Sequence, residues 1–377
     1  SSPAHHHSWE WSSPNPPYLS SFGDAFSTPP GSPLAHSTPT RGKEARQVVG
    51  AMQVLLSFDF ESLSGGGGGG LAYSEMVAQC VASYLSSPHA TVRIHAARVC
   101  LLLIVPSTGP LPRQSRLEKE VVRTLQALLQ IGVSDPDPAV RGAVWAGLRP
   151  VHFPYIATRE ATELLLMGLN DQSFEVREKA LVVSGSISTI NPACILPHLR
   201  HLLLELLTAL EAGRKSDRSD SARLLGSFIP SCPSLVAPFT LPILQALVPK
   251  LSDSNKRASA DCFRAIGLLV RKGGSAFAQV EGDVMGELVV ALEDRGSRRR
   301  RFEAAVALSR ITRGVGSAVT PYSKYPCLFP ALTGRIMVEP SFGVRRELIR
   351  AVGVLGAIAP HARELEGGGA APGEAIG

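Results

Sequence analysis

The sequence predicts an all-α protein in which pairs of helices stack side by side into an elongated solenoid. Three observations favour this fold class. Hydrophobic residues make up 44% of the 377 residues and aromatic residues only 6%, which suits stacked helices rich in Leu, Ala and Val better than aromatic-rich β-sheets. Similar segments recur at intervals of about 36 to 48 residues, the spacing of paired-helix repeats. Each recurrence begins with a signal that starts a helix.

Both ends of the chain are expected to lack stable structure. Residues 1–44 are rich in Ser and Pro, and residues 361–377 are rich in Gly and Ala; such segments bury too little apolar surface to offset the cost of ordering. Residues 45–360 should form the solenoid. The Gly run at 65–70 is interpreted as an insertion between two helices, because no helix presenting Lys and Ser or Thr follows it, as a phosphate-binding loop requires.

One motif recurs in each repeat and marks its second helix. It consists of a turn with Asp, Ser or Pro, then an Arg, then Ala about three residues later, and an apolar helix that ends near Gly. The clearest copy runs from Asp171 through Arg177 to Ala180 and Gly185. About seven copies fill the chain, with these arginines: Arg93, Arg141, Arg177, Arg218, Arg257, Arg301 and Arg345. The count predicts about seven helical pairs.

The residue types of the motif have physical roles within the stack. Asp or Ser in the turn can cap the second helix, which is worth ~1 kcal/mol. Pro136 and Pro138 block helix continuation, so the chain must turn there. Each Arg can donate charge-assisted hydrogen bonds to the turn of an adjacent repeat, which would give a ladder along the stack. We therefore predict structural anchors, and not phosphate-binding residues, at these positions: Arg93, Asp135, Arg141, Asp171, Arg177 and Arg345.

The first helix of each pair is expected within apolar or amphipathic stretches. These stretches are 121–131, 161–169, 196–210, 241–251 and 284–292. Between Leu199 and Leu207 the apolar residues cover most of the helix surface, so we expect this helix to be buried on more than one side.

The formal net charge of +6 comes largely from local clusters. The largest cluster is the run from Arg298 to Arg301, which we interpret as a solvated helix edge, with an acidic protein partner as the competing interpretation. Nucleic-acid binding should show a basic stripe interleaved with aromatic residues. The sequence lacks such a stripe, and we expect no nucleic-acid partner.

The sequence contains no recognisable catalytic or metal-binding motif. It lacks a G-x-S-x-G elbow, an H-E-x-x-H helix, a Walker loop and the set of protein-kinase motifs. We therefore expect no catalytic residues, no metal site and no cofactor in this chain. The longest uninterrupted apolar stretch, 99–105, is far shorter than the roughly 20 residues of a membrane-spanning helix. No direct membrane insertion is expected.

Several short segments occur in a fixed order along the repeats. They are 58–61, 133–138, 169–178, 191–193, 221–226, 321–326 and 345–356. In this order they resemble the HEAT-repeat region of the target of rapamycin (TOR) kinases, over roughly residues 45–360. The resemblance implies an armadillo-like superhelix of HEAT-type pairs.

The resemblance also implies a function, which belongs to a larger parent protein. Such a parent is a serine/threonine kinase that couples nutrient supply to growth, with ATP and Mg bound in a kinase domain that this chain lacks. The implied partners of the repeats are a raptor-like subunit and a second TOR protomer. The implied localisation is cytoplasmic, with lysosomal or vacuolar membranes and the nucleus reached through the parent complex. An independent HEAT or armadillo adaptor, of the transport-receptor or phosphatase-scaffold type, remains the alternative that the repeats alone allow equally well.

Overall fold

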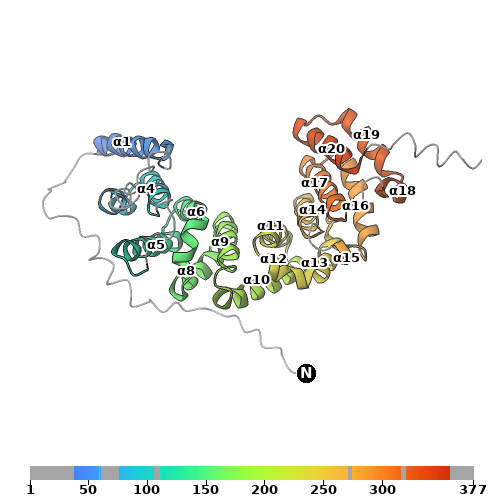
Figure 1. Ribbon diagram of the computed structural model, residues 1–377. Coiled ribbons are helices and arrows are strands. Elements are labelled where there is room, and N and C mark those ends of the chain that lie inside the picture. Colours follow the sequence, from blue (N-terminus) through green and yellow to red (C-terminus); the bar gives the residue numbers. More distant parts are fainter. Residues whose placement is uncertain are drawn as a thin grey trace, which may run out of the picture.

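The computed structural model describes residues 38–58, 60, 76–105, 111, 113–270, 274–315 and 320–356. Within these ranges the regular secondary structure is helical throughout. The helices stack into an open arc (Figure 1), which confirms the predicted all-α solenoid. Residues 1–37, the Gly run at 65–70 and the tail 361–377, for which we predicted segments without stable structure, lie outside the described residues.

Each repeat places its first helix on the outer side of the arc and its second helix on the inner side (Figure 1). The first helices are η2 (Val77–Val81) with η3 (Ala82–Ser86), α5 (Arg116–Ser134), α8 (Arg159–Leu169), α10 (Pro192–Ala212), α13 (Thr240–Leu247), α16 (Glu281–Glu293) and α19 (Leu328–Val338). The second helices are α4 (Ala90–Leu103), α6 (Pro138–Gly147), α9 (Phe174–Ile187), α11 (Lys215–Ser231), α14 (Lys256–Val270), α17 (Arg298–Val315) and α20 (Phe342–Leu355). The described residues thus form seven pairs, as the motif count predicted.

Short helices connect the pairs, and one long helix precedes them. The connecting helices are η4 (Pro150–His152), α7 (Phe153–Ile156), α12 (Pro233–Val236), η5 (Ala237–Phe239), η6 (Val248–Lys250), α15 (Gly274–Phe277) and α18 (Thr320–Lys324). The long helix is α1 (Thr38–Ser57), which packs on α4. It begins inside the segment 1–44 that we expected to be unstructured, and its Met52 is buried in the core.

The turn before α6 shows how the sequence starts a second helix. Asp137 is the N-cap residue and its carboxylate accepts a hydrogen bond from the Ala139 amide at 2.8 Å. Pro138 occupies the first helical position, where its missing N–H costs nothing. Val140 and Val144 then face the core and are fully buried.

The second helices form a continuous row of neighbours from α1 through α4, α6, α9, α11, α14 and α17 to α20. One close approach is the contact of α14 with α17. A Cβ on Gly267 would lie 2.9 Å from the Cα of Ala307, so the two backbones approach too closely for a larger residue there. Ala260, Ala304 and Ala307 are fully buried in the same contact region. Small side chains therefore set the spacing of the stack.

Helix α10 differs from the prediction that it is buried on more than one side. Its buried residues form a single stripe, consisting of Ile195, Leu199, Leu203, Leu206 and Leu210. Leu204, on the opposite side, is 53% exposed. Among the described helices α10 is the one that is long and apolar enough, by length and composition, to cross a membrane. In the arc its leucine stripe packs on neighbouring helices that include α8, α11 and α13.

Candidate functional site

The turns between first and second helices carry a row of arginine–carboxylate pairs. Arg93 donates from Nε and Nη2 to the two carboxylate oxygens of Asp135, at 2.8 and 2.9 Å. Arg141 binds Asp171 in the same two-pronged way, at 2.7 and 2.8 Å. In each pair the arginine belongs to one repeat and the aspartate to the turn of the next, and both aspartate side chains are only 5% exposed. Planar two-pronged pairs fix orientation as well as distance.

Each of these arginines also binds the turn of its own repeat. Arg93 donates to the carbonyl oxygen of Ser87 at 2.8 Å, and Arg141 donates to that of Asp135 at 2.7 Å. The aspartates accept in turn from backbone amides two residues later, so that the Ser173 amide donates to Asp171 at 2.7 Å. Each guanidinium therefore connects the turn before its own helix to the turn of the next repeat. We call this row of pairs the arginine ladder.

The hydrogen bonds of the ladder shift the pKa of three of its groups, Arg93, Arg141 and Asp171. Burial by itself would raise the pKa of Asp171, but the hydrogen bonds from Arg141 and the Ser173 amide outweigh it and lower the pKa below its ordinary value. The hydrogen bond to Asp135 raises the pKa of Arg93, and the hydrogen bond to Asp171 raises that of Arg141. Arg93, Arg141 and Asp171 are therefore ionised at neutral pH.

The ladder continues in the C-terminal half of the arc. Arg218 pairs with Asp253 at 3.0 Å. Arg301 binds both oxygens of Glu339, at 2.7 and 2.9 Å, with both side chains buried. Burial favours the neutral form of Glu339, but hydrogen bonds from Arg301, the Ser341 amide and Arg335 prevail and lower its pKa to about 2.

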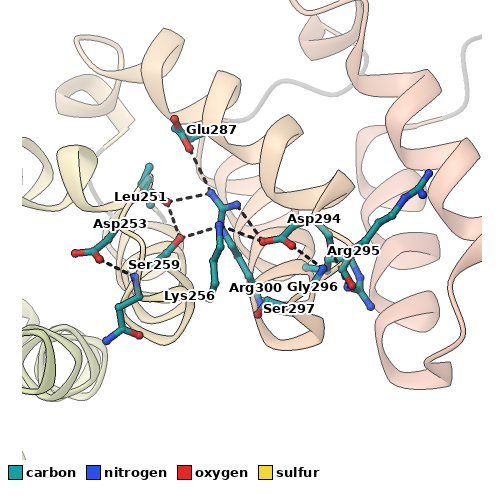
Figure 2. Close-up of polar contacts among 12 residues, drawn as sticks. Leu251, Asp253, Lys256, Ser259, Glu287, Asp294, Arg295, Gly296, Ser297 and Arg300 are labelled. Carbon is teal, nitrogen blue, oxygen red and sulfur yellow. Dashed lines mark hydrogen bonds and ion pairs between the residues drawn. The ribbon is translucent and has the colours of Figure 1, made fainter.

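The arginine run on α17 is not the solvated edge that we expected. Arg300 and Arg301 are 3% and 4% exposed, and only Arg298 and Arg299 of the run are exposed. Figure 2 shows Arg300 in the middle of a polar cluster. It donates to the Ser259 hydroxyl at 2.9 Å and the Leu251 carbonyl oxygen at 3.1 Å, and its carboxylate partners are Asp294 at 3.3 Å and Glu287 at 3.4 Å. The expectation was wrong for Arg300 and Arg301, because their side of α17 faces α14 and the neighbouring turns instead of solvent.

The ladder is interrupted at the turn between α10 and α11. That turn contains Ala212, Gly213 and Arg214 and therefore has no carboxylate. Arg177 binds the carbonyl oxygens of Asp171 and Gln172 in its own turn. Its ion-pair partner is Asp220 on α11, at 3.6 Å and 52% exposed. We call this interruption the Gly213 joint.

The structure brings together some of the predicted anchor residues and not others. Arg93 meets Asp135 and Arg141 meets Asp171, across adjacent repeats. Arg177 and Arg345 do not meet a predicted acid side chain. Arg345 donates to the Glu339 carbonyl oxygen, and it forms no ion pair within the part of the chain that the structure describes.

Sequence reasoning missed the most buried pair, Arg301 with Glu339, and the cluster around Arg300. A signal was present for Glu339, because it follows Arg301 by 38 residues, much as Asp135 follows Arg93 by 42. Glu339 also accepts from the amide two residues later, as the ladder aspartates do. The predicted motif placed Asp, Ser or Pro in the turn, so Glu339 was not recognised as the acid of this pair.

A second feature lies between α6, α9 and the C-terminal part of α11. Two adjoining cavities of about 320 and 700 Å³ share Phe153, Val182 and Ser227 in their walls. The smaller cavity is also lined by Trp145, Ala146, Leu148, Glu178, Lys179 and Val183. The larger one is also lined by Pro150, Ser186, Thr189, Ile190, Pro230, Ser231, Pro233 and Arg264. We call the two cavities together the inner groove. Within the described residues no cluster of His, Cys, Asp or Glu could hold a metal ion.

The chain is similar in sequence to protein kinases of one family. Residues 318–371 match a family model described as the serine/threonine-protein kinase mTOR domain. The chain is 29% identical to the serine/threonine-protein kinase tor1 of Schizosaccharomyces pombe over 92% of its length. It is 32% identical to the serine/threonine-protein kinase mTor of Drosophila melanogaster over 84% of its length. These matches cover only 14% and 13% of the two relatives.

Solved structures with a similar arrangement have low sequence identity to the chain. The structure of Kap121p bound to Ste12p aligns with 85% of this chain and 38% of that one, at 12% identity and a TM-score of 0.49. The designed armadillo repeat protein YIII(Dq)4CqI aligns with 64% of this chain and 96% of that one, at 18% identity and a TM-score of 0.38.

Proposed function

Because this chain corresponds to a helical-repeat segment of the target of rapamycin (TOR) kinase family, we propose that it is a protein-binding scaffold of a TOR-like serine/threonine kinase in nutrient and growth signalling. The observation that carries the proposal is similarity to TOR kinases over as much as 92% of the chain. The chain spans 14% or less of the length of those relatives, so the kinase activity is proposed for the parent and not for this segment.

The arginine ladder supports a scaffold role through its effect on shape. Each pair fixes one repeat relative to the next, because two-pronged bonds constrain angle as well as distance. A stack whose repeats are held in place loses little conformational freedom when a partner binds. A wide and rigid concave surface is the property that solenoid scaffolds use for binding.

We propose two partners for this scaffold, a raptor-like subunit and the second protomer of a kinase dimer. The family resemblance supports the choice of partners. Exposed apolar side chains near the C-terminal end of the arc offer contact area for such a protein. They are Met337, Val338 and Phe342, which are 83%, 66% and 76% exposed. Clustered exposed apolar residues of this kind mark interaction surfaces.

The proposal includes the chemistry and location of the segment. No cofactor binds this chain, and ATP and Mg act in the kinase domain of the parent. The segment resides in the cytoplasm and reaches lysosomal or vacuolar membranes and the nucleus as part of the parent complex. Imaging of the tagged parent protein tests this location.

A capture experiment tests the partner proposal. The full 377-residue chain, immobilised through a tag, should enrich a purified raptor-like subunit over an unrelated helical solenoid of similar length and charge. Equal recovery on both surfaces would contradict a raptor-like partner. A second measurement, sedimentation of the parent kinase with and without this segment, tests the contact between protomers.

A further inference from the structure

We propose that the inner groove is a docking site for a short segment of a partner protein in which an apolar side chain is flanked by acidic residues. This inference rests on the proposed scaffold function and adds a location and a chemistry to it. It concerns the groove between α6, α9 and α11, which is separate from the arginine ladder.

The floor of the groove is apolar and accessible. The two cavities, at about 320 and 700 Å³, have the size of sites that enclose several side chains. Val182 is 45% exposed and Ile190 is 47% exposed, and both line the larger cavity. Exposed large apolar residues in a concave site, surrounded by polar ones, are typical of binding surfaces.

Contacts between α9 and α11 fix the two walls of the groove at both of its ends. At one end Glu178 accepts from Arg223 at 2.7 Å and from the Ser227 hydroxyl at 2.8 Å. At the other end α9 and α11 approach closely, since a Cβ on Gly185 would lie 2.6 Å from the Cβ of Ser231. The groove is therefore preformed, and a ligand need not order it.

The charges beside the groove select the occupant. Lys179 lines the smaller cavity and Arg264 lines the larger one. In the described part of the chain neither of them forms an ion pair, whereas Glu178, the one acid in the lining, is already paired with Arg223. A segment with carboxylates on either side of an apolar residue would neutralise both cations, and a basic segment would be repelled.

The acids near Arg264 do not cancel its charge toward the groove. Asp261 and Glu303 are the carboxylates whose protonation Arg264 influences. Asp261 is almost fully buried and pairs with Arg299 at 2.6 Å. Neither acid lines the cavities, whereas Arg264 does. The groove therefore presents cations to an incoming chain.

A display selection followed by affinity measurement tests the inference. A phage library of random short peptides is selected on the immobilised full chain, and the selected consensus peptide is synthesised with a fluorescent label. Fluorescence polarisation then gives its dissociation constant for the wild type and for variants. We expect a consensus with Asp or Glu on both sides of a Leu, Ile, Phe or similar residue.

Two groove variants and two matched controls locate the binding. Val182→Glu and Lys179→Glu should each raise the dissociation constant by about tenfold or more. The controls Leu204→Glu on α10, where Leu204 is 53% exposed, and Lys119→Glu on α5 should change it less than about twofold. Val182→Ser, which adds no charge, provides a milder test if Val182→Glu lowers the helical circular dichroism signal.

The outcomes separate this inference from the proposed function. A neutral or basic consensus, no enrichment over an unrelated solenoid, or equal losses in the controls would overturn the groove as an acidic-peptide site. Self-association that Val182→Glu abolishes would instead assign the groove to a second copy, which also overturns the inference. Capture of the raptor-like subunit is measured separately, so a scaffold that works without the groove would be recognised as such.

Discussion

Adjacent repeats are joined in two different ways at two places in the arc. At α17 and α20 the join is closed, because Arg301 and Glu339 form a buried two-pronged pair and Arg335 adds a third bond. At the Gly213 joint, between α9 and α11, Arg177 has only a distant and half-exposed acid partner. The inner groove lies between the same two helices, at the C-terminal end of α11. Repeats are therefore held together both by ladder pairs at the turns and by other pairs between second helices, because α9 and α11, which lack a close ladder pair, are joined by Arg223 and Glu178 at 2.7 Å.

The strongest test of the comparison removes the acid of the closed join. Glu339→Ala should lower the free energy of unfolding of the C-terminal repeats by ~3 to 5 kcal/mol, because it leaves buried guanidinium groups without a counter-charge. Hydrogen exchange of α17 and α20 measures this, since solenoids unfold in local units. Glu293→Ala, an exposed acid on α16, is the matched control and should change little. Equal exchange in the two variants would show that the pair does not hold the join.

The lowered pKa of Glu339 predicts that the stability of the folded chain depends on pH. The pKa of Glu339 is lowered from 4.5 to about 2 in the folded chain, so its ionised form is stabilised by folding. This stability is fully present above pH 4.5 and is lost as the pH falls toward about 2. Acid unfolding followed by circular dichroism should therefore be steeper in this window for the wild type than for Glu339→Gln. Parallel curves would assign acid unfolding to other groups.

A pair of arginine substitutions compares the two kinds of join directly. Arg141→Ala should cost ~2 to 3 kcal/mol, because it leaves the buried Asp171 carboxylate without its partner. Arg177→Ala should cost ~1 kcal/mol or less, because its acid partner is distant and exposed. Urea denaturation of both variants, with the slope compared as well as the midpoint, gives the difference. Equal costs would mean that the interruption at Gly213 has no energetic consequence.

The smallest expected effect comes from restoring the missing acid. In other turns the ladder acid lies two residues before the N-cap residue, as Asp135 does before Asp137. Arg214 is the N-cap residue of α11, so Ala212→Asp supplies an acid at the equivalent position. We expect it to stabilise the chain by ~0.5 to 1 kcal/mol through Arg177. In the background of Arg177→Ala the gain should disappear, and a gain of the same size there would exclude a ladder contact.

The fold and part of the ladder could be predicted from the sequence because both depend on local periodicity. The spacing of the motifs predicted the seven pairs, and the Asp or Ser expected to cap the second helix is, in α6, Asp137. The pairs of Arg93 with Asp135 and of Arg141 with Asp171 follow the same register along the chain.

The features that could not be predicted from the sequence depend on how helices from separate repeats face one another. Periodicity could not show that Arg300 points toward Ser259 and Leu251 and not toward solvent. It also could not show the inner groove, since Phe153 of the connecting helix α7, Val182 of α9 and Pro230 of α11 meet only in the stack. The single buried stripe of α10 was missed because the composition of a helix does not tell how many neighbours cover it.

The Gly213 joint also has a mechanical consequence. A solenoid under tension extends by changing the angles between successive repeats, and each angle resists in proportion to the bonds that cross it. Between α9 and α11 a load applied across the two ends of the arc would fall mainly on the ion pair of Arg223 with Glu178 at 2.7 Å, because the pair of Arg177 with Asp220 is longer, at 3.6 Å. Because Glu178 also lines the inner groove, traction on the ends of the arc would be transmitted to this binding surface.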